Sequence, residues 1–83
     1  MPMDIIIYKG VSSLTIGDWT RLFRQLDKTG AKDDHEAARL IGEMPRPDYN
    51  ALFSLGPDMF GRQVVATIDD NYFLKTYTLW KRR

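Results

Sequence analysis

The fold is decided by residues 15–30, TIGDWTRLFRQLDKTG, which carry the strongest helical pattern in the chain. The large apolar side chains recur at the spacing that places them on one face of an α-helix: Trp19, Leu22, Phe23 and Leu26. Thr15 and Asp18 form a capping-box-like pair at the start, and Gly30 is a typical helix stop. We therefore expect an amphipathic helix here, packed on a hydrophobic core.

Polar side chains occupy the outer side of that helix. They include Arg21, Arg24 and Lys28, with Gln25 beside them. Such a stripe of cations can contact phosphate groups, although a solvated helix face has the same pattern and is more common.

The segments on either side predict a strand and a second helix. Residues 5–8, IIIY, are β-branched and aromatic, and they predict a buried strand that stops at Gly10. Asp33 begins the second helix, with Glu36 as its capping partner. Its apolar side chains repeat at helical spacing: Ala37, Leu40, Ile41 and Met44. We expect this helix to end at Gly42.

The C-terminal half predicts a short helix and then a hairpin. Pro47 suits a first helical turn, and the short helix ends at Gly56 and Pro57. Residues 64–68 alternate as a strand, residues 69–71 form a turn, and residues 72–80 form a long strand.

These elements give an α+β fold with the order β-α-α-α-β-β. We expect a C-terminal β-hairpin over residues 62–81 that completes a three-stranded sheet, in a single domain of residues 1–83. The last strand is apolar on both faces, so its surplus side chains indicate an interface: Tyr72, Leu74, Tyr77 and Trp80. Pairing of hairpins in a homodimer would cover them.

Composition excludes several kinds of chemistry. The chain has no Cys and one His, which excludes disulfides, a cysteine nucleophile and a histidine metal cluster. His35 stands at a helix start without a catalytic partner, and Asp69, Asp70 and Asn71 lack the glycine and distal glutamate of a calcium loop. We therefore expect that the protein is not an enzyme and that it binds neither a metal nor a cofactor. The N-terminus resembles neither a signal peptide nor a membrane span, which predicts a cytoplasmic protein.

The charges are distributed unevenly. The net charge is +1, but residues 27–58 carry seven acidic and four basic side chains, and residues 59–83 carry two acidic and five basic ones. The middle of the chain is therefore acidic and its end is basic.

Residues 33–56 have the spacing of a helix-turn-helix. Ala38 and Gly42 stand four positions apart, where that motif has a small residue between its helices and a left-handed glycine in its turn. Apolar residues follow if the turn is one residue longer than usual: Met44, Tyr49 and Leu52. The alternative is that Ala38 and Gly42 simply allow two helices to pack. Asp48 and the acidic surroundings argue against a DNA-reading helix.

With a strand before the motif and a hairpin after it, the order resembles that of the Cro family of bacteriophage repressors. The resemblance covers most of the chain by topology and residues 38–52 by sequence. It implies a homodimer joined through hairpin strands, with the second helix of the motif in the major groove of duplex DNA. It also implies that Arg46, Asn50 and Ser54 face the bases and that the basic tail contacts phosphates: Lys81, Arg82 and Arg83.

Two functions follow from these patterns. One is a small sequence-specific transcriptional regulator of Cro type that binds DNA as a homodimer. The other is a small phage-type protein-interaction module that inhibits a host protein complex through the acidic middle and the surplus aromatic side chains.

Overall fold

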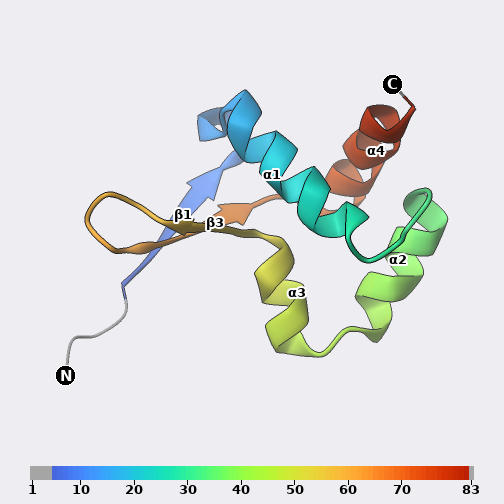
Figure 1. Cartoon of the computed structure of the whole chain (residues 1–83), viewed down its shortest axis with the longest axis horizontal. Coiled ribbons are helices and arrows are strands. Elements are labelled where there is room, and N and C mark those ends of the chain that lie inside the picture. Colours follow the sequence, from blue (N-terminus) through green and yellow to red (C-terminus); the bar gives the residue numbers. More distant parts are fainter. Residues whose placement is uncertain (1–4, 83) are drawn as a thin grey trace.

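A mixed sheet and the helices around it build the domain (Figure 1). The computed structural model describes residues 5–82, and within them the order is β-α-α-α-β-β-α. The elements are β1 (Ile6–Gly10), a 3-10 turn η1 (Val11–Ser13), α1 (Ile16–Asp27), α2 (Asp34–Glu43), α3 (Arg46–Leu52), β2 (Ser54–Pro57), β3 (Gln63–Thr67) and α4 (Asp70–Lys81).

The sheet has the strand order β1-β3-β2. β1 runs parallel to β3, with Ile7 opposite Val64, and β2 runs antiparallel to β3. The predicted three-stranded sheet is therefore confirmed, although its third strand is β2 and not residues 72–80. The β2–β3 hairpin projects away from the helices on one side of the molecule (Figure 1).

The predicted first helix is confirmed as α1. The Thr15 side chain accepts a hydrogen bond from the backbone N–H of Asp18, and the Asp18 carboxylate accepts one from the N–H of Thr15. This reciprocal pair satisfies two N–H groups that have no partner inside the helix. Leu22 and Leu26 are fully buried on the inner face, as their spacing predicts.

The C-terminal segment forms a helix, so the predicted hairpin over residues 62–81 is wrong. Asp69 caps α4 by accepting a hydrogen bond from the backbone N–H of Tyr72. Phe73, Leu74 and Tyr77 are buried together, at positions that share one face of a helix and fall on opposite faces of a strand. Residues 69–71 therefore start a helix and do not make a hairpin turn.

This correction also changes the predicted interface. Leu74 is 7% exposed and Tyr77 is fully buried, so both belong to the core of the chain itself. The ring of Phe73 stacks on that of Phe23 with 5.8 Å between centroids, which fastens α4 to α1. A dimer that pairs residues 72–80 as strands is excluded because those residues already form helical hydrogen bonds.

The turn between α2 and α3 differs from the predicted helix-turn-helix. Gly42 lies inside α2, outside the left-handed region, and a side chain added there would meet no atom within 4 Å. Ala38 is exposed, and its neighbour Ala37 is the buried residue. The chain turns instead at Met44 and Pro45, both extended, because a residue before proline is disfavoured in the helical region. Neither Ala38 nor Gly42 mediates a close approach of helices.

The turn between α2 and α3 directs the two helices to different packing partners. α2 packs mainly against α4, and α3 packs against α1. The predicted third helix is confirmed as α3, but it ends at Leu52. Ser54 therefore belongs to β2, not to a helical reading face.

Candidate functional site

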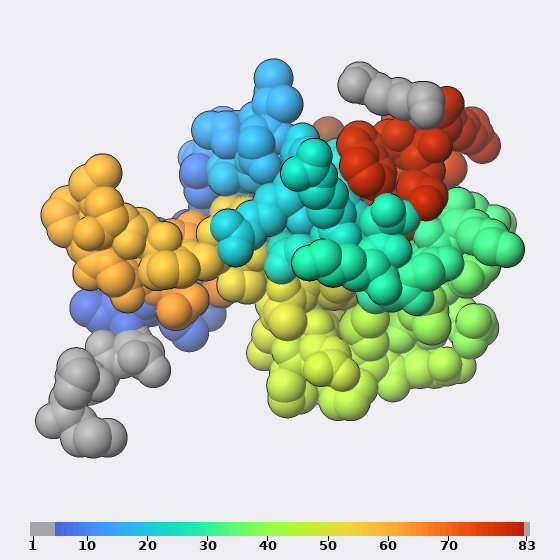
Figure 2. Space-filling model, in the orientation of Figure 1, coloured from blue at the N-terminus to red at the C-terminus, as the bar shows by residue number. Residues whose placement is uncertain are grey.

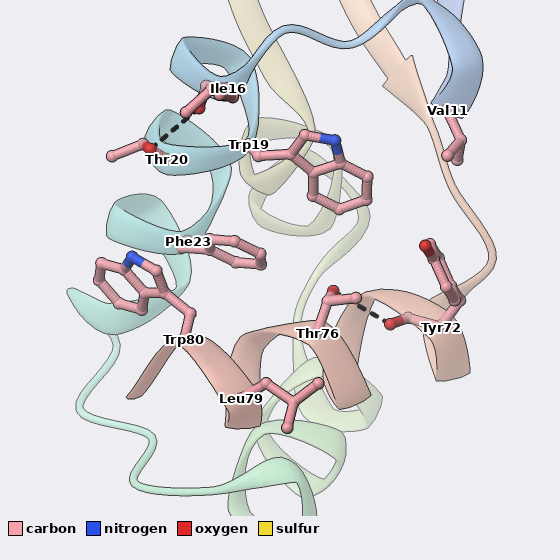
Figure 3. Close-up of a pocket in the computed structure, with 9 residues that line it drawn as sticks. All are labelled: Val11, Ile16, Trp19, Thr20, Phe23, Tyr72, Thr76, Leu79 and Trp80. Carbon is pink, nitrogen blue, oxygen red and sulfur yellow. Dashed lines mark hydrogen bonds between the residues drawn. The ribbon is translucent and has the colours of Figure 1, made fainter. Parts of the chain in front are cut away.

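A groove runs between α1 and α4, and we call it the α1–α4 groove (Figure 3). The two helices cross, since α1 runs from top to bottom and α4 from right to left in Figure 3. Near their start, the rings of Trp19 and Tyr72 are 6.1 Å apart between centroids. At their end, Lys81 Nζ lies 2.6 Å from the Asp27 carboxylate. The hollow between them has a volume of about 410 Å³.

The floor of the groove is aromatic. The rings of Trp19 and Trp80 flank that of Phe23, at 5.7 Å and 5.4 Å between centroids. Phe23 is buried beneath the two partly buried indoles. These two tryptophans are the only ones in the sequence, so both indoles report on this one place.

The walls of the groove are apolar and open to solvent. Ile16 is 87% exposed, Leu79 63% and Tyr72 50%. Val11, from the turn after β1, adds a fourth apolar side chain at one end (Figure 3). Single exposed apolar residues are common on proteins, but several around one aromatic hollow are typical of an interaction site.

The acidic groups beside the groove are engaged by neighbours. The hydrogen bond that Lys81 donates is the main cause that lowers the pKa of Asp27. Desolvation opposes this shift, and the positive charge of Lys81 adds to it. A hydrogen bond from Lys9 is the main cause that lowers the pKa of Asp18. Both carboxylates are therefore ionised, and the positive charge of the neighbouring lysine balances each of them.

A second hollow, of about 610 Å³, lies on the other side of α1. Its charged lining is Arg21, Arg24 and Lys28, which we call the basic face. The Gln25 amide donates hydrogen bonds to the backbone oxygens of Leu52 and Ser54, so this side of α1 rests on the junction of α3 and β2. α1 runs across the front of the molecule in Figure 2, beside the hairpin.

The residues predicted to bind DNA are dispersed. Arg46 and Asn50 are exposed on α3, where the Arg46 guanidinium lies 5.5 Å from the ring centroid of Tyr49, whereas Ser54 is half-buried in β2. Lys81 ends α4 and is paired with Asp27, so it is not part of a free tail. Arg82 is exposed beside it, and Arg83 lies outside the described residues.

Two of the four predicted interface residues line the groove. Tyr72 and Trp80 do so, while Leu74 and Tyr77 point into the core. Sequence reasoning missed Ile16 and Leu79. The available signal was that Leu79 is a large apolar residue away from the buried face of its helix, whereas Ile16 extends the Trp19 and Phe23 stripe of α1 by one turn.

The other residues considered as sites from the sequence are not arranged to bind a ligand within the described part of the chain. His35 is exposed at the start of α2. Within residues 5–82, no three His, Asp or Glu side chains gather in a way that could hold a metal ion. No helix in the same part of the chain has the length and apolar character needed to cross a membrane.

Comparisons with known proteins give no relative. No family model matches the chain, and no curated protein or solved structure shows significant similarity to it. The geometry and charge of the α1–α4 groove and of the basic face are therefore the basis for assigning a function.

Proposed function

We propose that this chain is a protein-binding module whose α1–α4 groove receives an apolar segment of a partner protein. The observation that carries the proposal is the exposure of Ile16, Tyr72 and Leu79 around an aromatic floor. Tryptophan and tyrosine are enriched among the side chains that dominate binding energy at protein interfaces. An inhibitor of a host protein complex would use a surface of this kind.

The energetics favour a partner that also makes polar contacts. Covering one large apolar side chain completely contributes about 1.5–3 kcal/mol, and the wall offers four that are exposed to different degrees. Association costs about 4–15 kcal/mol in lost translational and rotational freedom. Apolar burial in the groove therefore supports binding, but stable binding needs further contacts along the walls.

Selection from a random peptide library displayed on phage tests this proposal. Wild-type protein should enrich a family of apolar peptides, and Leu79→Glu should abolish their binding because it places a charge in the wall. Met59→Glu is the matched control, since Met59 is 89% exposed at the hairpin, away from the groove. Peptides that bind Leu79→Glu as tightly as wild type would contradict the proposal.

A second candidate function is DNA binding by a homodimeric regulator, and the basic face favours it. Arg21, Arg24 and Lys28 take part in no ion pair among residues 5–82, so all three are available to phosphates. Three such contacts predict that affinity for duplex DNA falls about 40-fold when salt rises from about 50 to about 200 mM. Fluorescence anisotropy of a labelled duplex measures this slope.

Two sets of variants separate the modes of DNA binding. Arg21→Ser with Arg24→Ser should flatten the salt dependence if α1 contacts the phosphates. Arg46→Ala and Asn50→Ala should weaken binding of a selected operator if α3 reads the bases. Absence of binding at low salt would exclude this candidate function.

A further inference from the structure

We infer that the occupant of the α1–α4 groove is an acidic amphipathic helix of a partner protein. This inference rests on the proposed function and specifies the chemistry of the partner. It follows from the charges that flank the groove, because both of its walls carry cations on their outer side: Arg24 on α1, and Lys75 and Arg82 on α4.

Thr20, one helical turn before Arg24, shows where Arg24 lies relative to the groove. Thr20 lines the α1–α4 groove and also borders the hollow of the basic face, which Arg24 lines. Thr20 is thus the ridge between the two hollows, and Arg24 lies just beyond it. An exposed arginine there can reach a carboxylate on a segment bound in the groove.

The cations of the other wall follow from helical spacing. Lys75 is three residues after Tyr72 and four before Leu79, both of which are exposed groove residues. Residues so spaced lie on one side of a helix, so Lys75 stands beside them. Arg82 lies three residues after Leu79 and is also exposed.

These three cations are not neutralised within the described part of the chain. None of them takes part in an ion pair in residues 5–82. Two of the nearby acids are neutralised, since Asp27 pairs with Lys81 and Asp18 pairs with Lys9, and the Asp69 carboxylate lies at the start of α4, where it caps the helix. The groove is therefore an apolar surface between two positive borders, which complements an apolar stripe between acidic residues.

The size and the side chains of the groove favour a helix over other anionic partners. The α1 wall of the groove extends from Ile16 to Phe23, a rise of about 10 Å, which matches about two turns of a bound helix with anchors at i, i+3 or i+4, and i+7. A single-stranded nucleic acid needs exposed ring faces for stacking. Here the most exposed lining residues, Ile16 and Leu79, are aliphatic, and the ring of Phe23 stacks on that of Trp80.

Two synthetic peptides of about 15 residues test the inference. They share the same leucine stripe and lack tryptophan, and they differ only in whether glutamate or lysine flanks that stripe. Binding is followed through the fluorescence of Trp19 and Trp80 in the full chain. At low salt, the glutamate peptide should bind at least ten times more tightly than the lysine peptide, with a blue shift of the emission.

Charge reversal provides the specific variant. Arg24→Glu with Lys75→Glu and Arg82→Glu should reverse the preference between the two peptides, because all three border charges change sign. Arg46→Glu, which reverses one charge on α3, should leave the preference unchanged. Circular dichroism and thermal unfolding of each variant verify that it is folded, since all these side chains are exposed.

The remaining outcomes separate the inference from the proposed function. Equal binding of both peptides, lost in Leu79→Glu, would overturn the acidic partner and leave the groove as a docking site. No binding of either peptide would contradict the docking site itself. Tighter binding of oligo-dT or of phosphatidylglycerol vesicles, lost in Leu79→Glu, would overturn the inference. The inference would also be overturned if the wild type were a dimer and Leu79→Glu a monomer, because the groove would then hold a second copy of this chain.

Discussion

Gly42→Ala should stabilise the protein. Gly42 lies within α2 at a helical position, and a methyl group there would meet no atom within 4 Å. Glycine in a helix interior is less favourable than alanine by about 0.8–1 kcal/mol. Gly42 precedes the last residue of α2, where a helix frays, so we expect about half of that gain.

The matched control is Gly30→Ala. Gly30 also has open space around it, but its φ is +87°, a conformation that costs an alanine about 1–2 kcal/mol. The two substitutions add the same methyl group and differ in the backbone conformation that receives it. Urea unfolding followed by circular dichroism should therefore give changes of opposite sign.

The outcome for Gly42 also tests the turn between α2 and α3. In the predicted helix-turn-helix, Gly42 would be left-handed and alanine would destabilise it as it does Gly30. A loss of 1 kcal/mol or more in Gly42→Ala would therefore refute the helical assignment and restore the helix-turn-helix.

Further predictions concern two anchoring hydrogen bonds. Tyr77→Phe should lower the free energy of unfolding by about 1–3 kcal/mol, because the Tyr77 hydroxyl donates to the buried Ala31 carbonyl at 2.6 Å. Tyr72→Phe, its half-exposed control, should change it by less than about 0.5 kcal/mol, and equal effects would contradict the packing of α4. Burial raises the pKa of Tyr77 to about 12, so wild type should lose stability as the pH rises from 10 to 12. Tyr77→Phe should lose less, keeping the loss that comes from Tyr49, whose pKa burial also raises. Asp18→Asn should cost about 1 kcal/mol at neutral pH, since it breaks the capping box and the ion pair with Lys9. Because the folded-state pKa of Asp18 is lowered, its contribution is present above the ordinary pKa of an aspartate and is lost as the pH falls through the folded-state pKa, so the unfolding curves of wild type and variant should converge in acid.

Local patterns predicted the elements whose signals were unambiguous. α1 has four large apolar side chains at one helical spacing and a capping pair at its start, so two independent features agree. The strands β1 and β3 are β-branched runs bounded by turn residues, and their place in one sheet was predicted. The prediction that β1 is buried was wrong, because β1 is an edge strand in which Ile6 and Tyr8 are exposed.

The C-terminal segment was misread because nearly all of its side chains are apolar or aromatic. A run of this kind alternates and also repeats at helical spacing, so periodicity does not distinguish the two. The deciding feature was Asp69, which was read as a turn residue and is the N-cap of α4. A proline likewise made the turn after α2, where a glycine was expected.

The groove was not predictable from local patterns because its walls come from two helices more than 40 residues apart in sequence. Ile16 and Leu79 each look like an isolated exposed apolar residue until α1 and α4 pack together. Tyr72 and Trp80 were identified because surplus aromatic side chains indicate an interface whether the segment is a strand or a helix.

The most direct test of the docking site is a two-dimensional NMR titration of the full chain with the glutamate-flanked peptide. The chain has two tryptophans, so two indole N–H signals report on the floor of the groove. We predict that both signals shift and saturate, while the backbone signals of Arg46 and Asn50 on α3 stay in place. Unmoved indole signals, or shifts confined to α3, would contradict the assignment of the α1–α4 groove as the binding site.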